Sequence, residues 1–289
     1  MKAWVAGEAL IDLFATAKGQ EAIVGGGPAN TAKALSRLGV PTSFIGGISS
    51  DEFGRMILDE LAEVDLGFVH RSELPTALAR VSLDLAGSAR YEFHLENTST
   101  FDFRREWLPV SKPTALHIGT LATIVEPGAN ELFEWAKALK IPIIFDPNVR
   151  PSFLSDQDKY RRAIERWVEI ATIVKLSDED LAWLGYENAN HFFELGAKLV
   201  VVTRGAAGIV GYRTDGFVSV PGIRVEVADT VGAGDTVGAI LVEGVIKFGL
   251  DMLNGEKLFE VLIRAAKAAA ITCTRVGANP PTLDELERF

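Results

Sequence analysis

Short apolar runs alternate with longer segments of helical periodicity through the middle of the chain. Apolar, β-rich runs occupy residues 141–145, 171–175 and 198–203, and the segments between them, 155–169 and 177–195, have a helical pattern. This alternation indicates βαβ units and a mostly parallel sheet that is buried on both faces. We therefore expect an α/β fold in which helices flank a central sheet. Ligands bind such sheets at the carboxyl ends of the strands, so the loops after residues 145, 175 and 203 are the first candidates for function.

Two regions depart from this alternation. Residues 75–95 alternate in character around Ala86-Gly87-Ser88, which predicts an antiparallel hairpin. Together with residues 10–24, this hairpin is expected to form a small β-sheet that stands off the main body and closes over substrate as a lid. Residues 212–220 predict a second hairpin, with its turn at 214–216. We treat residues 1–289 as a single domain that contains the lid.

Composition limits the possible functions. A chain of 289 residues, 48% of them hydrophobic, can bury a large core. Its net charge of −10 argues against partners such as nucleic acid or anionic membrane, which attract basic surfaces. No window reaches the roughly 18 apolar residues of a membrane span, and residues 1–12 read as a strand rather than a signal peptide. We expect a cytoplasmic protein. The single cysteine, Cys273, is expected to be a buried structural thiol.

The segment 227–248 carries the most informative pattern. Small residues, Gly232-Ala233-Gly234, lead into a run of helical spacing, which predicts a helix N-terminus at this point. Free N–H groups and the helix dipole make such an end an anion site, suited to a phosphoryl group in transfer. Asp235 could take the proton of an acceptor hydroxyl there. The alternative is that Asp235 only caps the helix.

A glycine-rich segment near the start offers a second candidate site. Pro28 follows three glycines and begins a predicted helix that ends at Gly39. The backbone at Gly26 and Gly27 could approach a polyhydroxylated ligand, and the Asn30 amide offers both a donor and an acceptor to sugar hydroxyls. A tight turn before a helix with a polar first turn would explain the same residues without a ligand.

Further polar residues follow predicted strands. Arg150, in the run Phe145-Asp-Pro-Asn-Val-Arg150, could contact a substrate oxygen or form a structural salt bridge. Asp12 is a candidate acceptor for substrate hydroxyls from the lid side. Small residues after the strand that ends at Thr203, among them Gly205 and Gly208, suit a nucleotide lying across the backbone, although an ordinary turn would look the same.

Several familiar signatures are missing from the sequence. It contains no Gly-x-x-x-x-Gly-Lys-Ser/Thr phosphate loop, no Gly-x-Gly-x-x-Gly closing a first βαβ unit, and no paired cysteines or His-Glu-x-x-His. A P-loop kinase and a dinucleotide-dependent oxidoreductase are therefore disfavoured. His117, inside an apolar run, is expected to be a packed strand residue.

The two glycine-containing segments together resemble the paired signatures of the PfkB or ribokinase-like carbohydrate kinases. These are Gly25-Gly-Gly-Pro-Ala-Asn-Thr-Ala near the start and Asp229-Thr-Val-Gly-Ala-Gly-Asp-Thr near the end. The resemblance implies a ribokinase-like fold and transfer of the ATP γ-phosphate to a primary sugar hydroxyl with Mg²⁺. It also implies that Asp235 is the base and that Gly232, Ala233 and Gly234 form an anion hole.

Within that family, residues 116–127 and 145–150 resemble the fructokinase branch. Ketodeoxygluconate kinase, ribokinase, and nucleoside or aminoimidazole riboside kinase remain alternatives, as does a sugar-binding regulator without activity. Where many members carry Asn-x-x-Glu, this chain has Ser177-Asp-Glu-Asp180, so the resemblance assigns only Asp180 to the Mg²⁺ shell. Several relatives bind a monovalent cation, and Asp229 with the loop at 275–277 would hold K⁺ here. The alternation of Val81, Leu83 and Leu85 suggests a homodimer formed through the lid.

Overall fold

A large, mostly parallel sheet forms the centre of the computed structural model, which describes residues 1–16, 19–83 and 89–289. Among the described strands of this sheet, β13 runs opposite to the rest, so its pairings with β12 and β14 are antiparallel and the other pairings are parallel. The α/β fold expected from the alternating pattern is confirmed. Within the described residues, this sheet has the order β14 (Gly216–Val220), β13 (Ile209–Arg213), β12 (Leu199–Thr203), β11 (Ile173–Ser177), β10 (Ile143–Asp146), β9 (Ala115–Gly119), β1 (Ala3–Ala6) and β4 (Thr42–Ile45).

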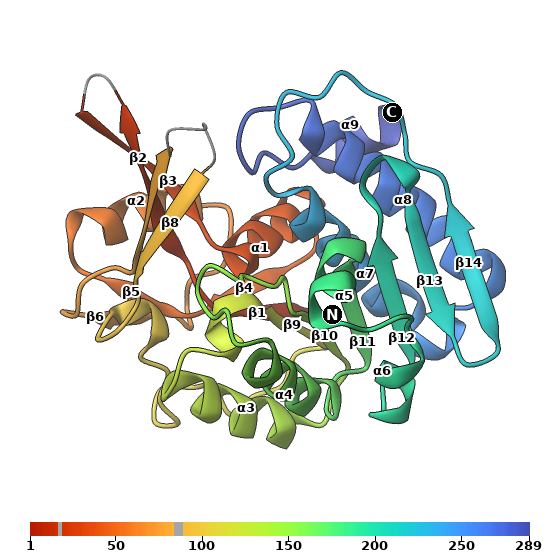
Figure 1. Cartoon of the computed structure of the whole chain (residues 1–289), viewed down its shortest axis with the longest axis horizontal. Helices are drawn as coiled ribbons and strands as arrows, with labels where there is room; N and C mark the ends of the chain where they lie inside the picture. Colours follow the sequence, from red (N-terminus) through yellow and green to blue (C-terminus); the bar gives the residue numbers. More distant parts are fainter. Residues whose placement is uncertain (17–18, 84–88) are drawn as a thin grey trace.

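Helices cover both faces of the central sheet (Figure 1). Successive side chains of a strand point to opposite faces, so Val5 joins one hydrophobic core while Trp4 and Ala6 join the other. The first core is covered by α1 (Gly27–Arg37), α2 (Glu52–Glu60), α7 (Ala233–Phe248), α8 (Gly255–Cys273) and α9 (Leu283–Arg288). The second is covered by α3 (Gly128–Leu139), α4 (Gln157–Val168), α5 (Asp178–Leu184) and α6 (Asn190–Glu194). Across the described ranges, none of these helices has the length and apolar character to span a membrane.

A separate small sheet lies at one side of the central sheet, at the left in Figure 1. Its strands follow the order β3 (Gly19–Gly25), β2 (Leu10–Thr16), β7 (Leu78–Leu83) and β8 (Ala89–His94). The predicted turn at 86–88, like Leu85, falls outside the described residues. A parallel pair, β5 (Gly47–Ser49) and β6 (His70–Ser72), and four short 3₁₀ turns complete the part of the chain that is described: η1 (Ser99–Phe101), η2 (Thr120–Thr123), η3 (Gly205–Ala207) and η4 (Leu250–Met252).

Glycines break two elements that the sequence predicts as continuous. The expected strand over 1–12 ends at Ala6, because Gly7 has a φ of 151° and a Cβ there would lie 2.4 Å from Pro28 Cγ. The chain then turns away into the small sheet. The expected helix over 177–195 is likewise two helices, since Gly185 has left-handed geometry, with a φ of 75°, and ends α5.

The expectation that Cys273 is a buried thiol is wrong. Cys273 is the last residue of α8 and is partly exposed, not fully buried. A helix end reaches the surface more readily than the middle of an apolar run. The thiol is still half-covered, and burial together with the negative charge of Asp229 raises its pKa.

Candidate active site

The N-terminus of α7 lies where the sequence predicts an anion site. Gly232 immediately precedes the helix with a left-handed φ of 79°, and a Cβ there would lie 2.8 Å from Ala278. The amides of Gly234 and Asp235 have no hydrogen-bond acceptor among the described residues, whereas the Ala233 amide donates weakly to the Thr230 carbonyl at 3.3 Å. Free N–H groups at a helix N-terminus favour a negatively charged ligand.

Asp235 lies in the first turn of α7 and is almost fully buried, with 8% of its surface exposed. Its Oδ2 accepts a hydrogen bond of 2.8 Å from Asn30 Nδ2, and the Thr31 hydroxyl donates to its backbone carbonyl at 3.3 Å. Burial, reinforced by the neighbouring Asp146, raises the pKa of Asp235 to about 6. Gly232, not Asp235, holds the N-cap position, and within the described residues the hydrogen bond on the Asp235 carboxyl comes from Asn30 rather than from the helix backbone, so capping does not account for this side chain.

The glycine-rich segment brings the start of α1 against this carboxyl. A Cβ at Gly27 would lie 2.8 Å from Thr120 Oγ1, 3.2 Å from Asp235 Oδ1 and 3.3 Å from Asn148 Nδ2. A Cβ at Gly25 would lie 2.4 Å from Asp12 Oδ2. Glycine therefore keeps open the space between the carboxyls. The structure brings together the candidates from both signatures, which are separated by about two hundred residues of sequence.

Gly26 is constrained more tightly than its neighbours. Its φ of 111° and a Cβ position only 2.5 Å from the Glu8 carbonyl exclude other residues. A tight turn before the helix therefore explains why residue 26 is a glycine. Gly27 has an ordinary φ, and a side chain is excluded there only by the polar groups that surround it.

Arg150 supplies positive charge to a group of carboxyls. Its guanidinium is exposed and donates to the carbonyls of Asn148 at 3.3 Å and Val149 at 3.1 Å. The alternative of a structural salt bridge is not supported, because Arg150 forms no ion pair in residues 1–16, 19–83 and 89–289. Burial raises the pKa of Asp12 to about 6, and Arg150 opposes this shift.

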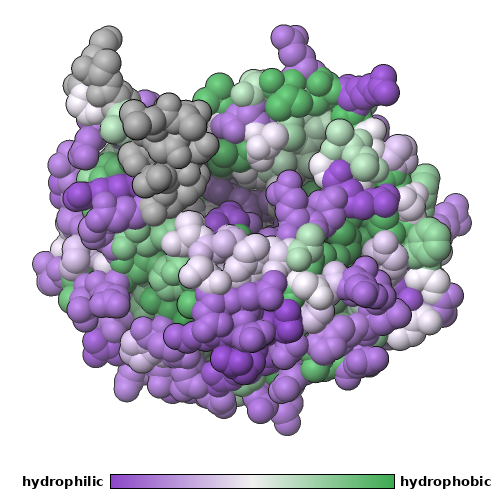
Figure 2. Space-filling model, viewed as in Figure 1, coloured by the Kyte–Doolittle hydropathy of each residue, from purple (hydrophilic) through white to green (hydrophobic). Residues whose placement is uncertain are grey.

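The surface near these residues is hollowed. Figure 2 shows a recess beside the small sheet, with hydrophilic residues exposed in it. The same view of the ribbon places the recess between the small sheet and the carboxyl ends of the central strands (Figure 1). A polar recess of this kind suits a polyhydroxylated ligand better than an apolar one.

The candidates after β12 form a tight turn. Gly205 has a φ of 48°, and a Cβ at Gly208 would lie 2.1 Å from the Val220 carbonyl. The Arg204 amide closes the turn by donating to the Gly208 carbonyl at 2.8 Å. Thr203 ends the strand, and its hydroxyl is 3.5 Å from the Leu176 carbonyl. Backbone geometry alone accounts for the glycines, and their contact with a nucleotide stays a prediction.

Asp180 already accepts hydrogen bonds from backbone. Its Oδ1 accepts from the Val149 amide and its Oδ2 from the Ser177 amide, each at 2.9 Å, and the second bond belongs to a capping box at the start of α5. The carboxylate thus ties the loop of Arg150 to α5. Across the described ranges, no group of three or more His, Cys, Asp or Glu side chains forms a ready metal site.

Asp229 fixes the loop at 275–277 through backbone hydrogen bonds. Its Oδ2 accepts from the Gly277 amide at 2.8 Å and its Oδ1 from the Val231 amide at 3.1 Å. Burial would raise the pKa of Asp229, but these backbone hydrogen bonds outweigh it and the pKa is lowered. The carboxyl is therefore a stable negative charge beside the loop that leads into α7.

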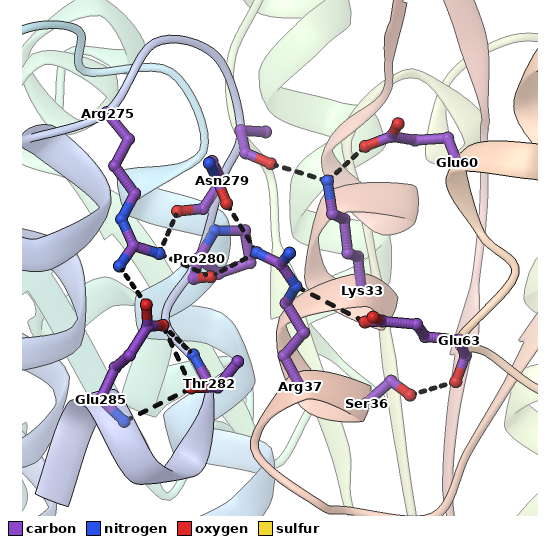
Figure 3. A network of polar contacts seen from close by, with 11 residues as sticks. Lys33, Ser36, Arg37, Glu60, Glu63, Arg275, Asn279, Pro280, Thr282 and Glu285 are labelled. Carbon is purple, nitrogen blue, oxygen red and sulfur yellow. Dashed lines mark hydrogen bonds and ion pairs between the residues drawn. The ribbon is translucent and has the colours of Figure 1, made fainter.

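A polar network holds the C-terminal segment against α1 (Figure 3). Arg37 donates to Asn279 Oδ1 at 2.6 Å, and Lys33 donates to the Ala278 carbonyl at 3.3 Å. Ala278 in turn contacts Gly232 closely enough to exclude a side chain there. The network thus connects the helix that carries Asn30 to the loop that begins α7.

Comparison with known proteins decides the family. The model of the pfkB family carbohydrate kinases matches residues 2–285. The chain belongs to this family. Within the pfkB family, it is 40% identical over 250 residues to a fructokinase from Rhizobium leguminosarum bv. trifolii, a match that covers 81% of this chain and 76% of the relative.

Solved structures of pfkB relatives share the fold over nearly the whole chain. A fructokinase from Xylella fastidiosa with bound ATP superposes with a TM-score of 0.91 at 29% identity, covering 99% of this chain and 97% of the other. A double mutant of the fructokinase from Vibrio cholerae, bound to fructose, ADP and potassium, gives a TM-score of 0.84 at 25% identity, covering 99% and 94%. The predicted ribokinase-like fold and sugar-kinase class are confirmed.

Sequence reasoning missed two polar residues of this pfkB kinase site, Lys175 and Glu8, whereas Asp146 lies in the run 145–150 that the sequence places at the carboxyl edge of the sheet. Lys175 and Asp146 form a buried ion pair of 2.7 Å. Glu8 is also buried, its Oε2 accepts from the Ala122 amide at 3.0 Å, and burial raises its pKa to about 7. A charged residue inside an apolar run is the signal that could have identified Lys175, because such a residue is rarely buried without a partner.

Proposed function

We propose that this carbohydrate kinase transfers the γ-phosphate of ATP to a primary hydroxyl of a sugar, with D-fructose as the acceptor and fructose 6-phosphate as the product. The observation that carries the proposal is the Asp235 carboxyl, which is buried, held by Asn30 and adjacent to free amides at the N-terminus of α7. A base beside an anion site is the arrangement that phosphoryl transfer to a hydroxyl requires.

In the proposed reaction, Asp235 accepts the proton of the sugar hydroxyl as its oxygen forms a bond to the γ-phosphorus. The bond from that phosphorus to the β,γ-bridging oxygen breaks, and ADP leaves with the electron pair. Amides of the segment Gly232, Ala233 and Gly234 would stabilise the negative charge of the group in transfer, because free N–H groups at a helix N-terminus favour an anion.

The sugar would lie between the small sheet and the start of α1. Asp12 accepts hydrogen bonds from its hydroxyls, Gly26 and Gly27 give it room, and Asn30 and Arg150 contact its oxygens. The supporting facts are the Cβ positions at Gly25 and Gly27, which show two carboxyls facing the same glycine segment. Polar groups placed in this way discriminate strongly between sugars.

The nucleotide would lie along the turn that contains Thr203, Gly205 and Gly208, where small residues leave backbone accessible. Mg²⁺ binds most kinase sites through few carboxylates, water and phosphate oxygens rather than a protein cage, so Asp180 fits as a helper. Each oxygen of Asp180 accepts one backbone hydrogen bond and retains acceptor capacity. Bound Mg²⁺ would neutralise charge on the phosphates.

A monovalent cation such as K⁺ would bind beside Asp229. The low pKa of this carboxyl and its hydrogen bond to the Gly277 amide support a fixed anionic loop there. The Vibrio cholerae fructokinase was solved with potassium, which supports the same choice of ion.

The small sheet would close over the sugar as a lid and exclude water. Its strands β3 and β8 lie at the edges of the sheet, so a second copy could pair there, and a homodimer through the lid stays a prediction. A cytoplasmic location also stays a prediction.

A coupled ADP-release assay with ATP and Mg²⁺ tests the proposal. The acceptor panel is fructose, ribose, ketodeoxygluconate, tagatose, adenosine and aminoimidazole riboside. A clear preference for fructose is expected. Activity only on another acceptor would leave the mechanism in place but show that fructose is not the substrate. If no acceptor is phosphorylated although sugar still binds, a sugar-binding regulator without activity would be favoured.

A further inference from the structure

A buried ion pair lies directly behind the anion site. Lys175, on β11, donates to Asp146 Oδ2 at 2.7 Å, and the two side chains are only 5% and 2% exposed. A Cβ at Gly234 would lie 2.9 Å from Lys175 Nζ, so the ammonium group sits against the first turn of α7. Asp146 Oδ1 has no hydrogen-bond partner within the described parts of the chain.

Stability alone does not explain this pair. Removing two charges from water costs more than their attraction commonly returns, and well-packed apolar residues can often replace a buried ion pair without loss of stability. Lys175 also shares a face of β11 with the apolar Ile173, which packs in the core beneath α7. The charges of Lys175 and Asp146 instead influence the ionisation of the titratable groups beside them.

The nearest titratable group in α7 is Asp235. Burial and Asp146 raise the pKa of Asp235, whereas Lys175 and, more weakly, Arg150 lower it. Lys175 stays protonated although burial opposes its charge, because Asp146, Asp235 and Asp180 hold its pKa above the usual value. The other segments around Asp235 contribute the amides of Asn30 and Asn148 and the hydroxyl of Thr31. The neutral imidazole of His117 lies against Gly238 of the same helix, and burial lowers its pKa to about 3.

We propose that Lys175, held in place by Asp146, is a positioning residue that keeps Asp235 ionised and supplies a fixed positive charge behind the backbone amide of Gly234. The inference rests on the proposed function, since it assigns a role within the same site. Lys175 does not touch the reacting atoms in this account. It acts through Asp235, and Asp146 fixes both its position and its charge.

The test measures the titration of Asp235 directly by NMR of protein labelled with ¹³C-aspartate, with the signal assigned by its loss in Asp235→Asn. Asp146→Asn is compared with Asp146→Asn/Lys175→Met, because in this background Lys175 is removed without leaving a second carboxylate. We expect the midpoint of Asp235 to lie at least about one pH unit higher in the double variant, a tenfold change in its proton affinity. Lys175→Met alone leaves two carboxyls that titrate as a pair, the upper step lying above the wild-type midpoint.

A difference below about 0.3 pH units between the two variants would overturn the inference, whatever the enzyme phosphorylates. The titration needs no turnover, so its failure is distinct from the failure of the acceptor assay. The double variant should fold, because it removes both charges of the buried pair and leaves neither unpaired. Ile173→Val controls for packing changes on the same strand face and should leave the midpoint of Asp235 unchanged. In an active enzyme, the acid limb of kcat/KM should move with the NMR midpoint.

Discussion

Alanine at Gly27 should impair sugar binding while leaving the backbone of α1 unstrained. Gly27 is the first residue of α1 and has no positive φ, so alanine is compatible with its backbone. Alanine also favours the helix over glycine by up to about 1 kcal/mol. The added Cβ, however, would enter the space between Thr120 Oγ1, Asp235 Oδ1 and Asn148 Nδ2, at 2.8, 3.2 and 3.3 Å.

The expected loss follows from these distances. Forcing a methyl group into a filled site costs roughly 1–3 kcal/mol. If this cost falls on the bound sugar, KM for the sugar rises by roughly 5- to 150-fold. KM for ATP should stay within about twofold, because the nucleotide turn after β12 is a different part of the site.

Steady-state kinetics with varied sugar and varied ATP, together with thermal unfolding, measure both effects. Gly67→Ala is the matched control, since Gly67 is exposed, lacks a positive φ, and lies in the loop held by Asp65 beside the start of β4. An unchanged KM for the sugar in Gly27→Ala, or equal changes for sugar and ATP, would refute the placement of the sugar against α1.

Three further results are expected. The value of kcat/KM should rise with pH through about 6 and flatten above about 7, because Asp12 and Asp235, whose pKa values are raised to about 6, act only as carboxylates; a profile flat from pH 5 to 8 contradicts this. Asp229→Ala should lose K⁺ activation, measured as the ratio of rates in KCl and in tetramethylammonium chloride, and an unchanged ratio would remove the cation site. Trp167→Ala should lower the free energy of unfolding by roughly 3–5 kcal/mol, because the indole is buried and donates to the Thr123 carbonyl at 2.9 Å; denaturant unfolding measures this, and a loss below about 1 kcal/mol contradicts the packing.

The parts of the fold that sequence predicted are those encoded locally. Apolar runs that alternate with helical segments predicted the strands β10 to β12. Glycines next to a helical pattern predicted the starts of α1 and α7. The breaks at Gly7 and Gly185 were missed because a single glycine leaves the apolar pattern intact. The effect of the glycine appears only when another part of the fold, such as Pro28 beside Gly7, leaves no room for a side chain.

The site divides in the same way. Asp235 and Asn30 were predictable because each lies in a recognisable local pattern, and their hydrogen bond confirms that the two patterns meet. The pairing of Lys175 with Asp146 depends on the register of neighbouring strands and on which face each residue takes. No local pattern specifies this register, so the charge behind the anion site became visible only in three dimensions.

The most direct test of the central claim is the turnover of Asp235→Asn with fructose, ATP and Mg²⁺. Asparagine keeps an oxygen that can accept the hydrogen bond from Asn30, so the fold and fructose binding, measured by calorimetry, should be retained. Loss of the base should lower kcat by roughly 10²- to 10⁴-fold. Near-normal turnover in a variant that binds fructose normally would contradict the account of Asp235 as the base of this kinase.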